Sequence, residues 1–173
     1  MKNKFGFILI KPQLGENIGA SARALKNFGF KHLSITDPRD GWPNIKAKAT
    51  SVEAFDILKK TKVLTNTKLA VKNFDLVFSF SARKRHVNKK HVSMVNFLKI
   101  LSLTKSKKIG LMFGPEASGL SNYDLSFSNY VVQIPSSPKF RSLNLSHSVS
   151  LVCYEIFKLN NYKLLNQSSF EKD

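Results

Sequence analysis

Short apolar runs alternate with amphipathic segments along this chain, and the alternation predicts the order of its elements. The continuous apolar run from Phe5 to Ile10 is typical of a strand that is buried on both faces. Near the other end, apolar residues recur every three or four positions over 145–159, which predicts a closing amphipathic helix. Between them the pattern predicts strands at 32–36, 63–64, 76–80, 109–113 and 130–134, and helices over 17–28, 45–50, 52–58, 66–72 and 95–101.

Strands that alternate with helices at this spacing indicate an α/β fold, a mostly parallel sheet with helices on both faces. We expect one domain over residues 1–160 and a polar C-terminal tail over 161–173 that frays. The polar, basic segment 81–91 is expected to be a solvated loop. Asn17 is expected to cap the first helix, because its side chain can accept a hydrogen bond from the helix backbone.

The charge of the chain indicates a polyanionic partner. Lys and Arg number 28 against 11 Asp and Glu, for a formal net charge of +17. From Leu76 to Pro115 there is no acidic residue and there are nine basic ones, which suggests a one-sign face. A generally lysine-rich proteome would account for part of the surplus without any partner.

Several common chemistries lack their motifs in this sequence. No Gly-rich dinucleotide or P-loop fingerprint occurs, and no serine lies in a nucleophile elbow. The four histidines, His32, His86, His91 and His147, lack metal-ligand spacing, so we expect no metal. The single cysteine, Cys153, falls in the apolar pattern of the last helix and is expected to be a buried thiol. No apolar run is long enough for a membrane span or signal peptide, so we expect a cytoplasmic protein with no membrane partner.

Three polar segments follow or precede the predicted strands where α/β sheets place their sites. They are Asn17-Ile-Gly-Ala-Ser-Ala-Arg23, Gly114-Pro-Glu-Ala-Ser-Gly-Leu-Ser121 and Ser142-Leu-Asn-Leu-Ser146. Their order and content resemble the motifs of the SpoU (TrmH) family of ribose 2'-O-methyltransferases, in the SPOUT superfamily. The run Ser81-Ala-Arg-Lys-Arg85 and the residues 14–20 look most like the TrmJ branch of that family.

The resemblance implies a C-terminal trefoil knot and an S-adenosylmethionine site in the loops after the strands. It implies methylation of a tRNA ribose at anticodon-loop position 32 by a homodimer with composite active sites, in which Arg23 of one subunit faces the cofactor of the other. Ala20, Ala24 and the last helix could supply the apolar contact between the two subunits. Gly114-Pro-Glu116 also resembles the TrmL branch, which acts at position 34, and ribosomal RNA stays an alternative substrate. An inactive RNA-binding module is the alternative from another class. The cofactor-binding residues that the resemblance implies are Phe80, Ser81, Ala82, Met112, Gly114, Ile134, Ser142, Leu143 and Asn144.

Arg23 is the first catalytic candidate. A guanidinium keeps its proton and is a poor base, so we expect Arg23 to bind a phosphate of the RNA and to stabilise the developing alkoxide. A base role, as is proposed in the family, would need neighbours that make this guanidinium easier to deprotonate. A solvated helix arginine is the plainer alternative.

The other candidates each have a structural alternative. Asn17 could face the substrate or only cap its helix, and Glu116 could hold Arg23, orient RNA or only begin a helix. Ser142 and Asn144 could position the ribose or the cofactor, or only shape the turn. Finally, the basic residues Arg83, Lys84 and Arg85 are expected to bind phosphates of the RNA. The structural alternative is a solvent-exposed charged loop without a partner.

Overall fold

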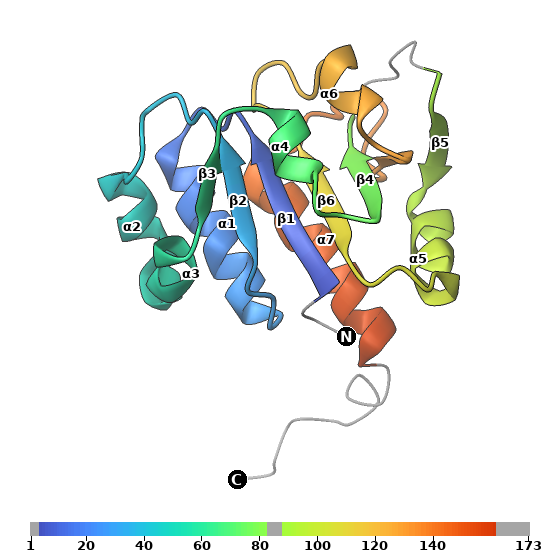
Figure 1. Ribbon diagram of the computed structural model, residues 1–173, viewed down its shortest axis with the longest axis horizontal. Helices are drawn as coiled ribbons and strands as arrows, with labels where there is room; N and C mark the ends of the chain where they lie inside the picture. The colour runs from blue at the N-terminus through green and yellow to red at the C-terminus, as the bar shows by residue number, and fades with distance from the viewer. Residues whose placement is uncertain (1–3, 83–87, 162–173) are drawn as a thin grey trace, which may run out of the picture.

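Within residues 4–82 and 88–161, which the computed structural model describes, seven strands form one sheet in the order β3-β2-β1-β6-β4-β7-β5 (Figure 1). Every neighbouring pair is parallel. The strands are β1 (Phe5–Ile10), β2 (Leu33–Thr36), β3 (Lys62–Leu64), β4 (Leu76–Phe80), β5 (Lys90–Ser93), β6 (Ile109–Phe113) and β7 (Tyr130–Gln133). The helices are α1 (Gly15–Asn27), α2 (Ile45–Ser51), the 3-10 helix η2 (Val52–Ala54), α3 (Phe55–Lys59), α4 (Thr67–Val71), α5 (Met94–Leu103), α6 (Asn122–Ser126) and α7 (Leu145–Asn160).

The strands in the interior of the sheet are buried on both faces. All six residues of β1 are buried, because β2 and β6 flank the strand and helices cover it from both sides. Successive side chains alternate between the faces, so Phe7 and Leu9 join one hydrophobic cluster while Ile8 and Ile10 join another. A continuous apolar run is therefore what this position in the sheet requires.

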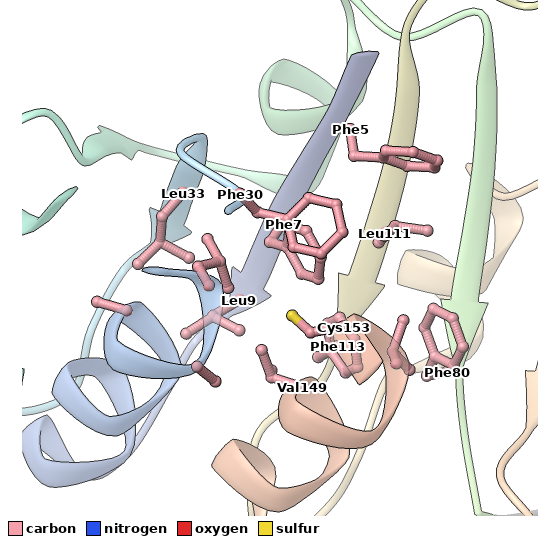
Figure 2. Close-up of a cluster of buried hydrophobic side chains, with 14 of the residues drawn as sticks. Phe5, Phe7, Leu9, Phe30, Leu33, Phe80, Leu111, Phe113, Val149 and Cys153 are labelled. Atoms are coloured by element: carbon pink, nitrogen blue, oxygen red, sulfur yellow. The ribbon is translucent and has the colours of Figure 1, made fainter. Parts of the chain in front are cut away.

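The two clusters define the two helical layers. The larger cluster lies between the sheet and α1, α2, α3, α5 and α7, and the smaller one lies under α4 and α6. Figure 2 shows Val149 and Cys153 of α7 pointing toward the sheet beside Phe113. Phe113 itself stacks on Phe80, with ring centroids 4.8 Å apart. Cys153 is fully buried, as predicted, and this burial raises the pKa of its thiol.

Most of the predicted elements are confirmed, α7 and β1 with nearly the predicted bounds. The sequence interpretation was wrong at β5, because residues 81–91 were expected to be a loop and Lys90–Ser93 pairs with β7. β5 is an edge strand with mostly exposed side chains, so it lacks the apolar alternation of a core strand. The five-residue helix α6 was missed as well, although Ser121 and Asp124 form a capping box at its start.

The cap expected at Asn17 was also wrong. Leu14 holds the N-cap position of α1, and Asn17 lies buried inside the first turn. The trefoil knot and the domain boundary at residue 160 stay predictions, and residues 162–173 of the expected tail lie outside the described residues. No helix in the described segments is long and apolar enough to cross a membrane.

Candidate functional site

A cavity of about 320 Å³ opens at the carboxyl edge of the sheet, among the loops that follow β4, β6 and β7 and the start of α7. This volume is at the lower end of the range typical of small-molecule sites, roughly 300–1,000 Å³. Its walls are mixed, with apolar side chains of the strands beside polar loop residues. The residues expected from the sequence to bind a cofactor that do line it are Phe80, Ser81, Ala82, Gly114, Ile134, Ser142 and Leu143.

Two of the expected cofactor residues do not line this cavity. Met112 is fully buried in the smaller hydrophobic cluster, since strand alternation directs its side chain to the face opposite Leu111 and Phe113. Asn144 turns its side chain toward α1 and the first turn of α7 instead. Met112 and Asn144 are therefore next to the cavity in the sequence, but their side chains point away from it.

The three polar segments meet through one chain of hydrogen bonds. The Asn144 amide donates to Asn17 Oδ1 at 3.0 Å, and the Asn17 amide donates to Glu116 Oε1 at 2.9 Å. The groups at both ends of this hydrogen-bonded chain fix the orientation of the side-chain amides of Asn17 and Asn144. Asn144 Oδ1 accepts from the backbone N–H groups of Ser146 and His147 at the start of α7, so its NH₂ group must point away, toward Asn17.

Glu116 also holds the loop that precedes α1. Its carboxylate accepts the backbone N–H of Gln13 at 2.7 Å and that of Leu14 at 3.1 Å. In return, Gln13 Oε1 accepts the backbone N–H of Ala117 at 3.1 Å. Glu116 therefore joins the first two motifs through the backbone, and contact with Arg23, one of the expected roles, is replaced by contact with Asn17. Gln13 was missed by the sequence analysis, because a lone glutamine in a loop carries no recognisable signal.

The loop after β6 is closed on itself. Gly114 lies so near the backbone of Gly119 and Leu120 that a Cβ atom would collide with both. Gly119 has a φ of +67° and donates its N–H to the Pro115 carbonyl at 2.8 Å. The glycines thus shape the wall of the cavity, with Glu116 between them.

Among the described residues, two charged ones line the cavity, Glu116 and Arg141. Arg141 is exposed and lies beside Ser142, which is also part of the wall. The sequence analysis did not single out Arg141, even though it directly precedes the third motif. Arg23 is exposed on α1 and is not part of the lining in this single chain. The remaining RNA-binding candidates, Arg83, Lys84 and Arg85, lie outside the described residues. In residues 4–82 and 88–161, no three His, Cys, Asp or Glu side chains come together as metal ligands would.

Comparison with known proteins identifies the family of this chain. The model of the SpoU rRNA Methylase family matches residues 4–154, nearly the whole described fold. The chain belongs to this family. Among SpoU relatives, the tRNA (cytidine-2'-O-)-methyltransferase TrmJ of Methanocaldococcus jannaschii is 34% identical over 152 residues, which cover 87% of this chain and 66% of the relative.

Solved SpoU structures share the fold. The crystal structure of TrmJ from Z. mobilis ZM4 superposes with a TM-score of 0.84 at 36% identity, over 90% of this chain and 70% of that one. The SpoU methyltransferase AviRb from Streptomyces viridochromogenes, solved in complex with the cofactor AdoMet, has a TM-score of 0.66 at 17% identity, over 92% of this chain and 59% of that one. This chain therefore spans about two thirds of the length of its relatives, and it lies with the TrmJ branch of the SpoU family.

Proposed function

We propose that this protein transfers a methyl group from S-adenosylmethionine to a ribose 2'-oxygen of tRNA, at anticodon-loop position 32. The observation that carries the proposal is the hydrogen-bonded chain Asn144–Asn17–Glu116, which brings three distant motifs to the edge of one cofactor-sized cavity. The M. jannaschii relative is a tRNA (cytidine-2'-O-)-methyltransferase, which supports the reaction and the class of substrate. A cytoplasmic location, where tRNA is found, is part of the proposal.

The cavity suits the proposed cofactor chemically. An adenine ring needs an apolar slot with backbone hydrogen-bond partners, and the wall combines Phe80 and Ile134 with the loop residues Gly114 and Leu143. Ser142 adds a hydroxyl for a polar group of the ligand. When bound there, S-adenosylmethionine supplies an electrophilic methyl group.

Arg23 is proposed to act on the RNA. Its guanidinium can bind the phosphate next to the target ribose through two parallel hydrogen bonds, and its fixed positive charge stabilises the 2'-oxygen as that oxygen becomes negative. Asn17 and Glu116 serve as positioning residues, since they hold the start of α1, the helix that carries Arg23, against the cavity wall. Asn144 ties the same unit to α7.

A homodimer with composite sites explains how Arg23 reaches a cavity that it does not line within one chain. The outer side of α7 exposes Leu151, Tyr154 and Leu159, each at least 40% accessible, which suits burial against a second copy. Ala20, which is half-buried, can join this contact. Ala24 cannot, because it is only 4% exposed and packs inside the chain's own core.

Ribose methylation mapped on total tRNA from cells with and without the gene tests the target. We expect one methylated ribose, at position 32, to disappear without the gene and to return when the purified protein and S-adenosylmethionine are added. Methylation at position 34 or of ribosomal RNA would correct the target but keep the reaction. RNA binding without any calorimetric binding of the cofactor would identify an inactive module and refute the proposal.

The role of Arg23 has its own test. We expect Arg23→Ala to lower the rate of methyl transfer by roughly 100-fold or more, the usual loss when a group that stabilises developing charge is removed. Its affinity for S-adenosylmethionine should stay within about twofold, because Arg23 is proposed to contact the phosphate and the 2'-oxygen of the RNA and not the cofactor. Lys72→Ala, which removes an exposed charge at the end of α4 on the face of the sheet opposite α1, is the control. Full turnover by the Arg23 variant would remove Arg23 from the mechanism.

A further inference from the structure

A second cavity, of about 470 Å³, lies on α2 and α3, away from the three motifs. Its floor is apolar and includes Trp42, which is the only tryptophan of the chain, and Phe55. Both rings are partly buried against the edge of the main core. The residues that line this groove, which we call the Trp42 groove, are Trp42, Pro43, Asn44, Ile45, Lys48, Phe55, Leu58 and Lys59.

The apolar surface of the Trp42 groove is more exposed than the fold requires. Ile45 is 83% accessible, the largest value among the exposed large hydrophobic residues of the described chain. A single exposed aliphatic residue is ordinary, but here it adjoins an indole and a phenyl ring in a concave surface. Such a surface is typical of a binding site for a flat apolar group.

The rim of the Trp42 groove is positively charged. The ammonium groups of Lys48 and Lys59 each lie 4.9 Å from the centroid of the Phe55 ring. Both lysines are exposed, and in the described part of the chain neither forms an ion pair, whereas nearby Lys46 and Lys26 do. Two ammonium groups over the Phe55 ring, neither with a carboxylate partner among the described residues, complement a ligand that is both anionic and flat.

The Trp42 groove is also connected to the proposed active site. Asn44 caps α2 by accepting the N–H groups of Lys46 and Ala47, and its side chain packs against Gly15 so closely that a Cβ atom there would collide with it. Gly15 follows Leu14, whose N–H donates to Glu116. Asn44 of the groove and Glu116 of the cofactor cavity therefore contact the same short segment, 13–15.

We propose that the Trp42 groove binds an unpaired base of the RNA substrate, outside the target nucleotide. The apolar floor contacts the face of the base, and Lys48 and Lys59 contact the phosphates on either side of it. Stacking on an aromatic floor tolerates different bases, so the groove contributes affinity and placement of the RNA more than sequence readout. The inference rests on the proposed function, because it takes RNA to be the substrate.

The single tryptophan provides a direct measurement. We expect titration with a short oligouridylate to quench the fluorescence of Trp42 saturably, and added salt to weaken the binding. Reversing both rim charges with Lys48→Glu and Lys59→Glu should raise Kd at least about tenfold and reduce the slope of log K against log salt by about 1.4, the value for two single-strand phosphates. Ile45→Asn should raise Kd by about fivefold or more without a change in that slope, since it alters the apolar contact alone.

The matched control reverses two lysines elsewhere. Lys68→Glu with Lys72→Glu changes the net charge by the same amount at α4, which covers the face of the sheet opposite α2 and α3, and it should raise Kd by less than about threefold. Equal weakening by both double variants would reduce the effect to net charge and overturn the proposal.

The remaining outcomes separate this proposal from the proposed function. Methylation of tRNA without any oligouridylate-dependent change in Trp42 emission would overturn the groove and leave the function standing. Quenching that depends on Lys48 and Lys59, together with no methyl transfer to any RNA, would support the groove and refute the function. A change in emission that follows protein concentration without RNA, matched by dimerisation in sedimentation, would assign the groove to a second copy and overturn the proposal.

Discussion

Glu116 offers the sharpest test of how the site is held together. Its carboxylate accepts three hydrogen bonds, from the N–H of Gln13 at 2.7 Å, the N–H of Leu14 at 3.1 Å and the amide of Asn17 at 2.9 Å. In Glu116→Gln the side chain keeps its shape, but one of its two terminal atoms becomes an NH₂ donor. Because all three partners are donors, at least one of the bonds must be lost.

The magnitude follows from this count. A hydrogen bond to a charged group contributes roughly 1.5–3 kcal/mol, and the lower value applies here because Glu116 is partly exposed and water can replace a lost partner. Glu116→Gln should therefore lower the free energy of unfolding by about 1.5 kcal/mol. A chain of this size loses about 2–4 °C in Tm for each kcal/mol, so we expect a fall of about 3–6 °C. Glu116→Ala loses all three bonds and should cost about twice as much or more.

Thermal unfolding followed by circular dichroism measures the stability, and calorimetry with S-adenosylmethionine measures the site. The cofactor Kd should rise several-fold in Glu116→Gln, because Glu116 lines the cavity and holds its wall to α1. Glu53→Gln is the matched control, since the exposed Glu53 should change stability by less than about 0.5 kcal/mol. A Glu116→Gln protein with unchanged Tm and cofactor affinity would refute the account of the hydrogen-bonded chain.

Three further predictions concern single residues. Gly114→Ala should lower Tm by several degrees and weaken cofactor binding, because its Cβ would collide with the backbone at Leu120; both measurements at wild-type level would contradict the closed loop. Arg141→Ala should weaken binding of tRNA or cofactor about fivefold, measured by filter binding and calorimetry, since Arg141 is the cation among the residues that line the cavity; unchanged values for both would exclude it. Burial raises the pKa of the Cys153 thiol in the folded chain, so the unfolded chain releases this proton first and stability falls as pH rises above about 8.5. Urea unfolding should show a shallower loss above that pH in Cys153→Ala, by up to about 1.4 kcal/mol per pH unit, and equal slopes would refute it.

Hydrophobic periodicity was a reliable guide where an element buries a large apolar face. β1 and α7 were predicted with nearly their observed bounds, because each must cover the core with a continuous run or stripe of apolar side chains. The same reasoning failed for β5 and α6, which are short and lie at the edge of the fold. Their structure is decided by pairing with β7 and by a local capping box, and neither leaves an apolar pattern.

The candidate site was also predicted only in part. The order of the three motifs in the sequence predicted which segments would meet, and a hydrogen-bonded chain joins them. The sequence did not predict side-chain direction, so Met112 was expected at a cavity from which its strand turns it away. Gln13 was missed because its hydrogen bond joins it to Ala117, which is 104 residues away in the sequence. Arg141 was missed because only the shape of its loop places it at the cavity.

The sequence by itself determined the class of the fold, the order of its main elements, the strong positive charge and the three polar segments that mark the family, since each of these is encoded by residue type at local spacing. The tertiary structure alone decided that Asn17 binds Glu116 and does not cap α1, that Arg23 lies outside the cavity of its own chain, and that Trp42, Phe55 and two lysines share one groove. The physical reason is that a hydrogen bond or a cavity wall joins atoms that only the folded backbone brings together, and local patterns along the chain carry no record of those distances.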